Sequence, residues 1–154
     1  MPLAAVLFIL LLTSCDPTKN LQKQEDEQIA AYLSQNTNLS FIKQPSGFYY
    51  LEVVAGTGIS PVVGDTAYVN YTGKFLDGSI FDTNATAGKP LACIVGRDIV
   101  GFDEGLLKMK VGGKSTFLIP SSLGYGSYGS YSIPGYTPLL FDVELVKVAS
   151  PTGK

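Results

Sequence analysis

The sequence predicts an α+β domain in which an antiparallel sheet of five or six strands wraps around one short helix. Three observations support this fold class. Residues after Gly47 form short β-prone runs separated by Gly, Pro and Asp-Gly. Within that region, only the segment from Phe102 to Met109 has apolar residues at helical spacing. No internal repeat is visible, which argues against a solenoid or a propeller.

Six segments are expected to form strands. Asp77-Gly78 is a strong hairpin signal between two of them. In the last segment, apolar residues alternate with acidic ones from Phe141 to Leu145, as a half-buried strand requires. The alternation changes phase at Val146, which predicts a bulge or a covered edge. The expected strands are residues 48–54, 66–75, 79–81, 91–95, 115–119 and 139–148.

The one helix expected within the domain is about two turns long. Phe102, Leu106 and Met109 recur at spacings of four and three, which places them on one face. Gly105 weakens the helix, and Gly112-Gly113 ends it. Because its apolar stripe needs a partner, we expect it on the concave face of the sheet.

The N-terminus has the pattern of an export signal. Leu3 to Leu12 is an apolar run that would span about 15 Å as a helix, half of a bilayer core. Such a run has the length of the apolar region of a secretory signal. The following Leu12-Thr13-Ser14-Cys15 resembles the lipobox of bacterial lipoproteins, which implies that Cys15 is diacylated and becomes the new N-terminus. The alternative is an ordinary signal with an incidental cysteine.

These features suggest four regions along the chain. We expect a signal peptide at 1–14, a lipidated polar tether at 15–46, the globular domain at 47–148 and a tail at 149–154. Because no Lys or Arg precedes the apolar run, the natural start is expected a few residues upstream. Within the tether, Gln22 to Ser34 predicts a short amphipathic helix. We favour a solvated spacer for this helix over a dimerisation or docking element.

Composition excludes several kinds of chemistry. The chain has 154 residues, no histidine, two cysteines and a formal net charge of −2. Without histidine there is no Ser-His-Asp or Cys-His nucleophile and no imidazole metal ligand. Two cysteines build neither a disulfide framework nor a four-thiolate zinc site. The charge also argues against nucleic acid as a partner.

Four tyrosines stand close together in a loop rich in Gly, Ser and Pro. They are Tyr125, Tyr128, Tyr131 and Tyr136. Tyrosines offer flat apolar faces with hydroxyl tips, which suit the lining of a small pocket. The same composition also suits a low-complexity surface loop, and composition alone leaves both interpretations open.

Blocks of specific residues favour a pocket. In chain order they are Val69-Asn70-Tyr71-Thr72-Gly73, Asp77-Gly78, Phe81-Asp82, Gly101 to Leu106, Ile119 to Gly126, Ile133-Pro134 and Leu140 to Leu145. Together they resemble the FKBP-type peptidyl-prolyl cis–trans isomerases, in the order and near the spacings of that family. The resemblance covers roughly residues 47–148, which is essentially the whole globular part.

The resemblance implies an apolar pocket between the sheet and the helix. Tyr71, Phe81 and Phe141 would form its walls. Phe102, where the family often has tryptophan, would form the floor, and Ile133 would complete the lip. Taken singly, each aromatic residue is best explained by core packing. Their joint pattern favours the pocket.

Polar roles follow from the same resemblance. Asp82 would lie near the twisting amide, Tyr125 would donate its hydroxyl to a bound carbonyl, and Ile99 or Val100 would supply a backbone N–H. The implied activity is isomerisation of Xaa-Pro bonds in envelope proteins during folding. Rotation of such an amide crosses a barrier of about 18–20 kcal/mol. A thousandfold acceleration requires only about 4 kcal/mol of differential binding, and no cofactor.

The implied partners are proline-containing polypeptides, together with macrolide-type inhibitors of the pocket. The protein would be a membrane-anchored lipoprotein of the cell envelope, facing the periplasm or the surface. Two alternatives remain at this point. One is a non-catalytic chaperone or docking module with the same fold. The other is an unrelated small β-barrel lipoprotein, which would lack the central helix.

The sequence departs from the family pattern at three places. The segment between Gly96 and Gly101 is about two residues shorter than usual, which leaves open whether Ile99 or Val100 faces the substrate. Leu91 and Cys93 stand where aromatic residues are common, so one wall is expected to be thinner. We interpret Cys93 as a small core residue. Residues 128–131 form this chain's own version of a variable loop, expected to tune substrate choice.

Overall fold

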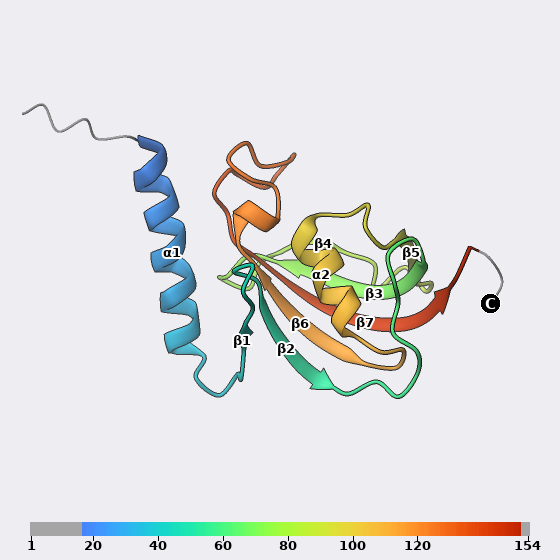
Figure 1. Cartoon of the computed structure of the whole chain (residues 1–154). Helices are drawn as coiled ribbons and strands as arrows, with labels where there is room; N and C mark the ends of the chain where they lie inside the picture. Colours follow the sequence, from blue (N-terminus) through green and yellow to red (C-terminus); the bar gives the residue numbers. More distant parts are fainter. Residues whose placement is uncertain (1–16, 152–154) are drawn as a thin grey trace, which may run out of the picture.

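The structure, a computed structural model, describes residues 17–151. A curved antiparallel sheet surrounds helix α2, and helix α1 lies beside the sheet on its other side (Figure 1). The expected signal and lipobox, including Cys15, lie outside the described residues. Among residues 17–151, no helix is both long enough and apolar enough to cross a bilayer.

The sheet has seven strands in the order β1-β2-β6-β7-β3-β4. Strand β5 pairs with the first half of β3, on the same edge where β4 pairs with its second half. The helical elements are α1 (Pro17–Gln35), α2 (Val100–Lys108) and a 3₁₀ turn, η1 (Ser121–Leu123). The strands are β1 (Ile42–Lys43), β2 (Tyr49–Val54), β3 (Thr66–Lys74), β4 (Ile80–Thr83), β5 (Leu91–Ile94), β6 (Lys114–Ile119) and β7 (Leu139–Ala149).

The predicted fold class is confirmed, and all six expected strands are present with ends shifted by no more than two residues. The bulge expected at Val146 is also confirmed, because Tyr68 pairs with Lys147 whereas Val69 pairs with Leu145. Strand β1 was not expected. It adds a two-residue edge strand from within the predicted tether, paired with β2. The central helix excludes the unrelated barrel, which would have none.

Helix α2 begins and ends slightly earlier than the apolar spacing indicates. Ile99 has extended backbone angles, and its carbonyl accepts hydrogen bonds from the amides of Phe102 and Asp103, so helical geometry starts at Val100. Met109 is extended again and ends the helix before the glycine pair. Phe102 and Leu106 are buried within the concave face. Both side chains belong to the main hydrophobic core between the helix and the sheet.

Strands β6 and β7 are apolar on both faces at one end. Phe117, Ile119 and Phe141 point into the main core with α2. Leu118 and Leu140, which alternate with them, point to the opposite face and are also buried. Two covered faces explain why these strands have consecutive apolar residues where alternation would otherwise be expected.

Helix α1 covers this outer apolar patch. Ile29 is 5% exposed and packs against Leu118 and Leu140, with Tyr32 and Leu33 beside it. The solvated-spacer interpretation of this helix is therefore wrong. The helix is also longer than the expected 22–34 segment, since it begins at Pro17. Burying an apolar face against the sheet supplies the stability that a short isolated helix lacks.

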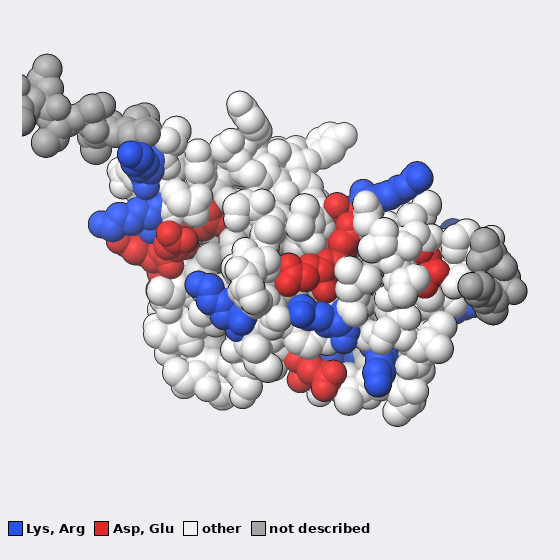
Figure 2. All heavy atoms as spheres, viewed as in Figure 1, with Lys and Arg blue, Asp and Glu red and all other residues white. Residues whose placement is uncertain are grey.

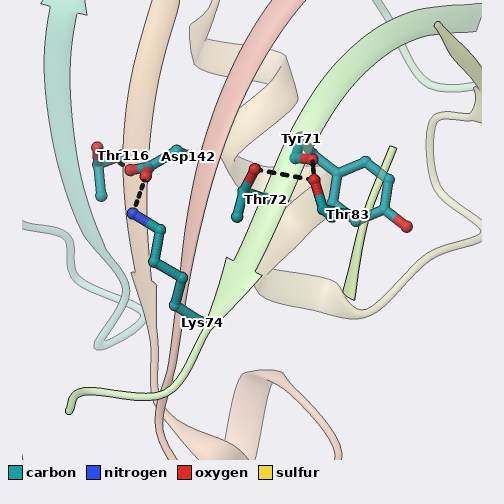
Figure 3. A network of polar contacts seen from close by, with 6 residues as sticks. All are labelled: Tyr71, Thr72, Lys74, Thr83, Thr116 and Asp142. Atoms are coloured by element: carbon teal, nitrogen blue, oxygen red, sulfur yellow. Dashed lines mark hydrogen bonds and ion pairs between the residues drawn. The ribbon is translucent and has the colours of Figure 1, made fainter. Parts of the chain in front are cut away.

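Beyond this patch, the outer face carries a network of polar side chains. Thr116 donates a hydrogen bond to Asp142 at 2.8 Å, and Lys74 forms an ion pair with the same carboxylate (Figure 3). Thr72 and Thr83 hydrogen-bond across β3 and β4 at 3.0 Å. These side chains satisfy one another at a solvated surface, as the half-buried alternation of β7 predicts. In the view of Figure 2, acidic and basic side chains are interspersed over the surface.

Candidate functional site

A small cleft opens where the N-terminus of α2 meets strands β3 and β4 and the loop that follows η1. Its volume is about 110 Å³. Most of the side chains predicted for the site meet here, although they come from segments spread over seventy residues of chain. The lining residues are Tyr71, Phe81, Asp82, Leu91, Asp98, Ile99, Phe102, Tyr125 and Phe141.

Aromatic rings form the apolar walls of this cleft. Phe141 lies at their centre, with ring centroids 5.3 Å from Phe102, 5.5 Å from Phe81 and 6.3 Å from Tyr71. Phe102 and Phe141 are buried, so they form the floor and rear wall. The edge-to-face geometry of the pairs with Phe81 and Phe102 is the arrangement that aromatic quadrupoles favour. The four rings hold one another in place and leave an apolar surface between them.

Gly73 on β3 makes room for one of these walls. A Cβ at this position would lie 2.5 Å from Cζ of Phe81 and 3.1 Å from Cε1 of Phe141. The first distance is shorter than real Cβ contacts and the second is tight, so the absence of a side chain leaves room for the Phe81 ring beside β3. The glycine in the Tyr71-Thr72-Gly73 block is therefore required by packing.

The polar groups of the cleft are two phenols and two carboxylates. The Tyr71 hydroxyl donates a hydrogen bond to Oδ2 of Asp82 at 2.6 Å, which fixes both side chains. Burial, and then this hydrogen bond, raise the pKa of Tyr71 well above its ordinary value. Burial, followed by the charges of Asp98 and Asp82, also raises the pKa of Tyr125. Both phenols therefore stay protonated at neutral pH and remain able to donate hydrogen bonds.

Asp98 is a member of the cleft that the sequence interpretation missed. Burial and the nearby charge of Asp103 raise the pKa of its carboxyl. Its backbone N–H donates to Asp103 Oδ2 at 3.1 Å, which ties the short 96–101 segment to the first turn of α2. A single aspartate in a loop has no periodicity or motif to single it out. The shortened segment was the only available hint that this position differs.

The structure also shows that the neighbours Ile99 and Val100 differ in their relation to the cleft. Ile99 lines the cleft, whereas Val100 is 61% exposed and lies outside the lining. Leu91 also lines the cleft, and the thinner wall expected there stays a prediction. Cys93 is buried, and burial followed by the charges of Asp98 and Asp103 raises the pKa of its thiol to about 11. This cysteine is therefore an unreactive core residue.

The tyrosine-rich loop contributes unequally to the site. Tyr125 lines the cleft itself, and Ile133 is buried at an adjoining hollow of about 210 Å³ that also includes Tyr131. Tyr128 and Tyr131 are otherwise fully exposed. The loop carries no charged residue, and the corresponding end of the molecule is uncharged in Figure 2. Of the four tyrosines, Tyr125 lines the cleft and Tyr131 lines the adjoining hollow. Tyr128 and Tyr136 line neither.

Three larger hollows lie elsewhere on the molecule. One of about 350 Å³ lies on the outer face and is lined by side chains of β3, β6 and β7 together with Val53 and Ala85. A second, of about 720 Å³, lies between α1 and the β3–β4 hairpin, and a third, of about 460 Å³, lies between α1 and the start of β2. None of them brings together buried aromatic walls and converging hydrogen-bond groups, so we place the candidate site in the smaller cleft. Within residues 17–151, no group of three or more His, Cys, Asp or Glu residues could hold a metal ion.

Comparisons with known proteins agree with the geometry of the cleft. A family model described as FKBP-type peptidyl-prolyl cis-trans isomerase matches residues 58–146. The FKBP-type peptidyl-prolyl cis-trans isomerase FkpA of Aeromonas hydrophila is 37% identical over 137 residues, covering 88% of this chain and 49% of the relative. FkpA of Escherichia coli K12 is 44% identical over 103 residues, covering 67% of this chain and 38% of the relative. The chain thus spans half or less of the length of these two curated relatives.

Solved structures give the same result. The crystal structure of FkpA from Escherichia coli has a TM-score of 0.74 at 34% identity, over 86% of this chain and 64% of that one. A peptidyl-prolyl cis-trans isomerase from Pseudomonas syringae pv. tomato has a TM-score of 0.76 at 29% identity. That likeness covers 89% of this chain and 99% of the solved one.

Proposed function

This chain belongs to the family of FKBP-type peptidyl-prolyl cis-trans isomerases, and we propose that it accelerates rotation about Xaa-Pro bonds in the cleft between α2, β3 and β4. One observation carries the proposal. The buried rings of Phe102 and Phe141 form an apolar floor, and the hydroxyl of Tyr125 and the carboxylate of Asp82 lie at its rim.

Apolar walls favour the transition state for amide rotation. The planar amide is more polar than the twisted one, because resonance places partial charges on its oxygen and nitrogen. Moving the substrate out of water therefore costs the planar form more than the twisted form. The rings around Phe141 provide such surroundings, and no covalent step is needed.

Polar groups at the rim hold the peptide while one side of the bond turns. Tyr125 stays protonated and can donate to a substrate carbonyl, and the backbone N–H of Ile99 is the second proposed donor. Asp82 is kept in place by Tyr71 and faces the turning amide. Fixing one end of the peptide lowers the entropy lost on reaching the twisted state. The proposed substrates are therefore proline-containing polypeptides held by a few backbone contacts, with macrolide-type molecules as competitors for the cleft.

The test is the isomerisation rate of short Leu-Pro and Phe-Pro peptides in the presence of the full chain in detergent. We expect acceleration, and about a tenfold lower kcat/KM for Tyr125→Phe and for Asp82→Ala, or about 1.4 kcal/mol of lost transition-state stabilisation each. Tyr128→Phe is the matched control, because Tyr128 is 97% exposed and outside the cleft. Peptide binding without acceleration would favour a non-catalytic docking module. Equal isomerisation rates in all three variants would mean that the catalytic site is not in this cleft.

We further propose a location at the cell envelope, with Cys15 as the lipid-modified residue. The support is the apolar run from Leu3 to Leu12 followed directly by Leu12-Thr13-Ser14-Cys15. In such a location, the clients would be envelope proteins during folding. Expression in a bacterium fed labelled palmitate tests this. The wild-type chain should carry the label and Cys15→Ser should not, whereas an unlabelled wild-type chain would contradict the anchor.

A further inference from the structure

We propose that Glu25 of helix α1 is a positioning residue that holds the Tyr125 loop against the cleft. This inference builds on the proposed function, because it concerns the loop that would supply the substrate's hydrogen-bond donor. It also gives helix α1, which lies outside the family match at residues 58–146, a role in the site.

Glu25 is fully buried although it lies in the most polar part of α1. Its Oε1 accepts a hydrogen bond from the backbone N–H of Ser121 at 2.5 Å, and its Oε2 accepts one from the Ser121 hydroxyl at 2.6 Å. Gln22, one turn earlier on the helix, donates to Oε2 at 3.1 Å. A buried carboxyl is tolerated only when its oxygens are satisfied in this way. Ninety-six residues separate the two main partners, so the contact joins distant parts of the chain.

Ser121 is the first residue of the segment that carries Tyr125. It is 3% exposed and is the first residue of η1, separated from β6 by Pro120 alone. Its carbonyl accepts hydrogen bonds from the backbone N–H groups of Gly124 at 2.9 Å and Gly126 at 2.8 Å, the two neighbours of Tyr125. The carbonyl of Gly126 in turn accepts from the N–H of Tyr136 at 3.0 Å, which closes the loop. Ser121 is therefore the fixed point from which the backbone on both sides of Tyr125 is held.

The carboxylate of Glu25 is suited to this position because it is an acceptor on both oxygens. An amide at the same place has one accepting oxygen and one donating nitrogen, so it keeps the bond from the Ser121 N–H. Alanine keeps neither, and leaves the Ser121 N–H and hydroxyl buried without that partner. Ile29, four residues later on the same face, packs against Leu118 and Leu140 and presses the helix onto the sheet. Figure 1 shows η1 beside α1 at this end of the sheet.

The first readout is hydrogen exchange of the full chain in detergent, since it does not depend on catalysis. In Glu25→Ala, backbone amides of residues 121–136 should exchange at least tenfold faster, while amides of β6 and β7 exchange as in the wild type. Glu27→Ala is the matched control, because Glu27 lies on the exposed side of α1 and forms an ion pair with Lys23 on the same helix. Unchanged exchange in the loop would overturn the inference, whether or not the wild-type chain is an isomerase.

The second readout is a double-mutant cycle with Tyr125→Phe. A residue that acts through Tyr125 should lower kcat/KM about fivefold by itself and much less in the Tyr125→Phe background. Equal losses of kcat/KM in both backgrounds, with unchanged hydrogen exchange in the loop, would show a purely structural role.

Glu25→Gln should recover most of the activity. If Glu25→Ala does not fold, Ser121→Ala removes the hydroxyl bond alone and should show the same pattern at smaller size. A wild-type chain without activity would refute the proposed function and leave the exchange result to decide the positioning.

Discussion

The two helices bind the same sheet in different ways. Helix α2 lies in the concavity and buries Phe102 and Leu106, so its contacts with the core are apolar. Helix α1 lies on the outer face and buries one apolar side chain, Ile29, together with one carboxylate, Glu25. The first mode supplies stability and builds the floor of the cleft. We expect the second to supply less stability, but through Glu25 it accepts two specific hydrogen bonds from Ser121.

This difference determines whether a residue acts on the cleft directly or from a distance. Phe102 touches the cleft directly, and a change in α2 is expected to alter both stability and the site. Glu25 reaches the cleft only through Ser121 and the backbone around Tyr125. Changes in α1 should therefore alter the site with a smaller effect on the core.

The largest effect is expected from Leu106→Ala on α2. Leu106 is fully buried in the main core, so its removal loses transfer free energy and leaves a cavity. We expect the free energy of unfolding to fall by about 3 kcal/mol. The neighbouring Leu107 is 41% exposed and is the matched control, with a loss below about 1 kcal/mol expected for Leu107→Ala. Urea denaturation measures both, and equal losses would contradict the assignment of α2 to the core.

A smaller effect is expected from Ile29→Ala on α1. Ile29 is 5% exposed, and we expect the helix to detach from the sheet without unfolding the domain, which would limit the loss to about 2 kcal/mol. Leu21→Ala, at a position that is 42% exposed on the same helix, should lose less than about 0.5 kcal/mol. Hydrogen exchange should show opening of α1 alone in Ile29→Ala. Global unfolding with no separate opening of α1 would mean that both helices belong to one cooperative unit.

The smallest effect is expected at the rim of the cleft, from Asp98→Asn. The pKa of Asp98 is raised by burial and by Asp103, so the ionised form is disfavoured in the folded protein. Its stabilising contribution is present below the ordinary carboxyl pKa and is lost as pH rises through the raised value. The variant should therefore be more stable than the wild type at pH 7, by about 0.5 kcal/mol, because solvent screens this partly exposed group. Thermal unfolding at pH 7 and pH 3 tests this, and a gain that persists at pH 3 would contradict it.

Local patterns were enough to predict the central domain. Alternating apolar residues and glycine-rich turns indicated six strands and α2, and even the phase change at Val146 marked a true bulge. The resemblance to the family indicated Tyr71, Phe102 and Phe141, which the fold brings within contact of one another. Their assigned roles stay predictions until they are tested.

The long-range polar contacts could not be predicted. Glu25 stands between residues as polar as itself, and nothing local distinguishes it from the exposed Asp26 and Glu27. One signal was available and was not used. Phe117-Leu118-Ile119 and Leu139-Leu140-Phe141 are consecutive apolar runs, which indicate strands covered on both faces and hence a partner for the outer face. Asp98 had no such signal, because its role depends on the path of one short loop.

The central claim is that the cleft of about 110 Å³ between α2, β3 and β4 binds the Xaa-Pro bond. It is tested most directly by titrating a Leu-Pro peptide into the ¹⁵N-labelled full chain and following backbone chemical shifts. We predict that the largest shifts occur at Ile99, Tyr125 and their neighbours around the 110 Å³ cleft. Largest shifts at Asn70, Thr116 and Glu144, which line the 350 Å³ hollow on the outer face, would contradict it.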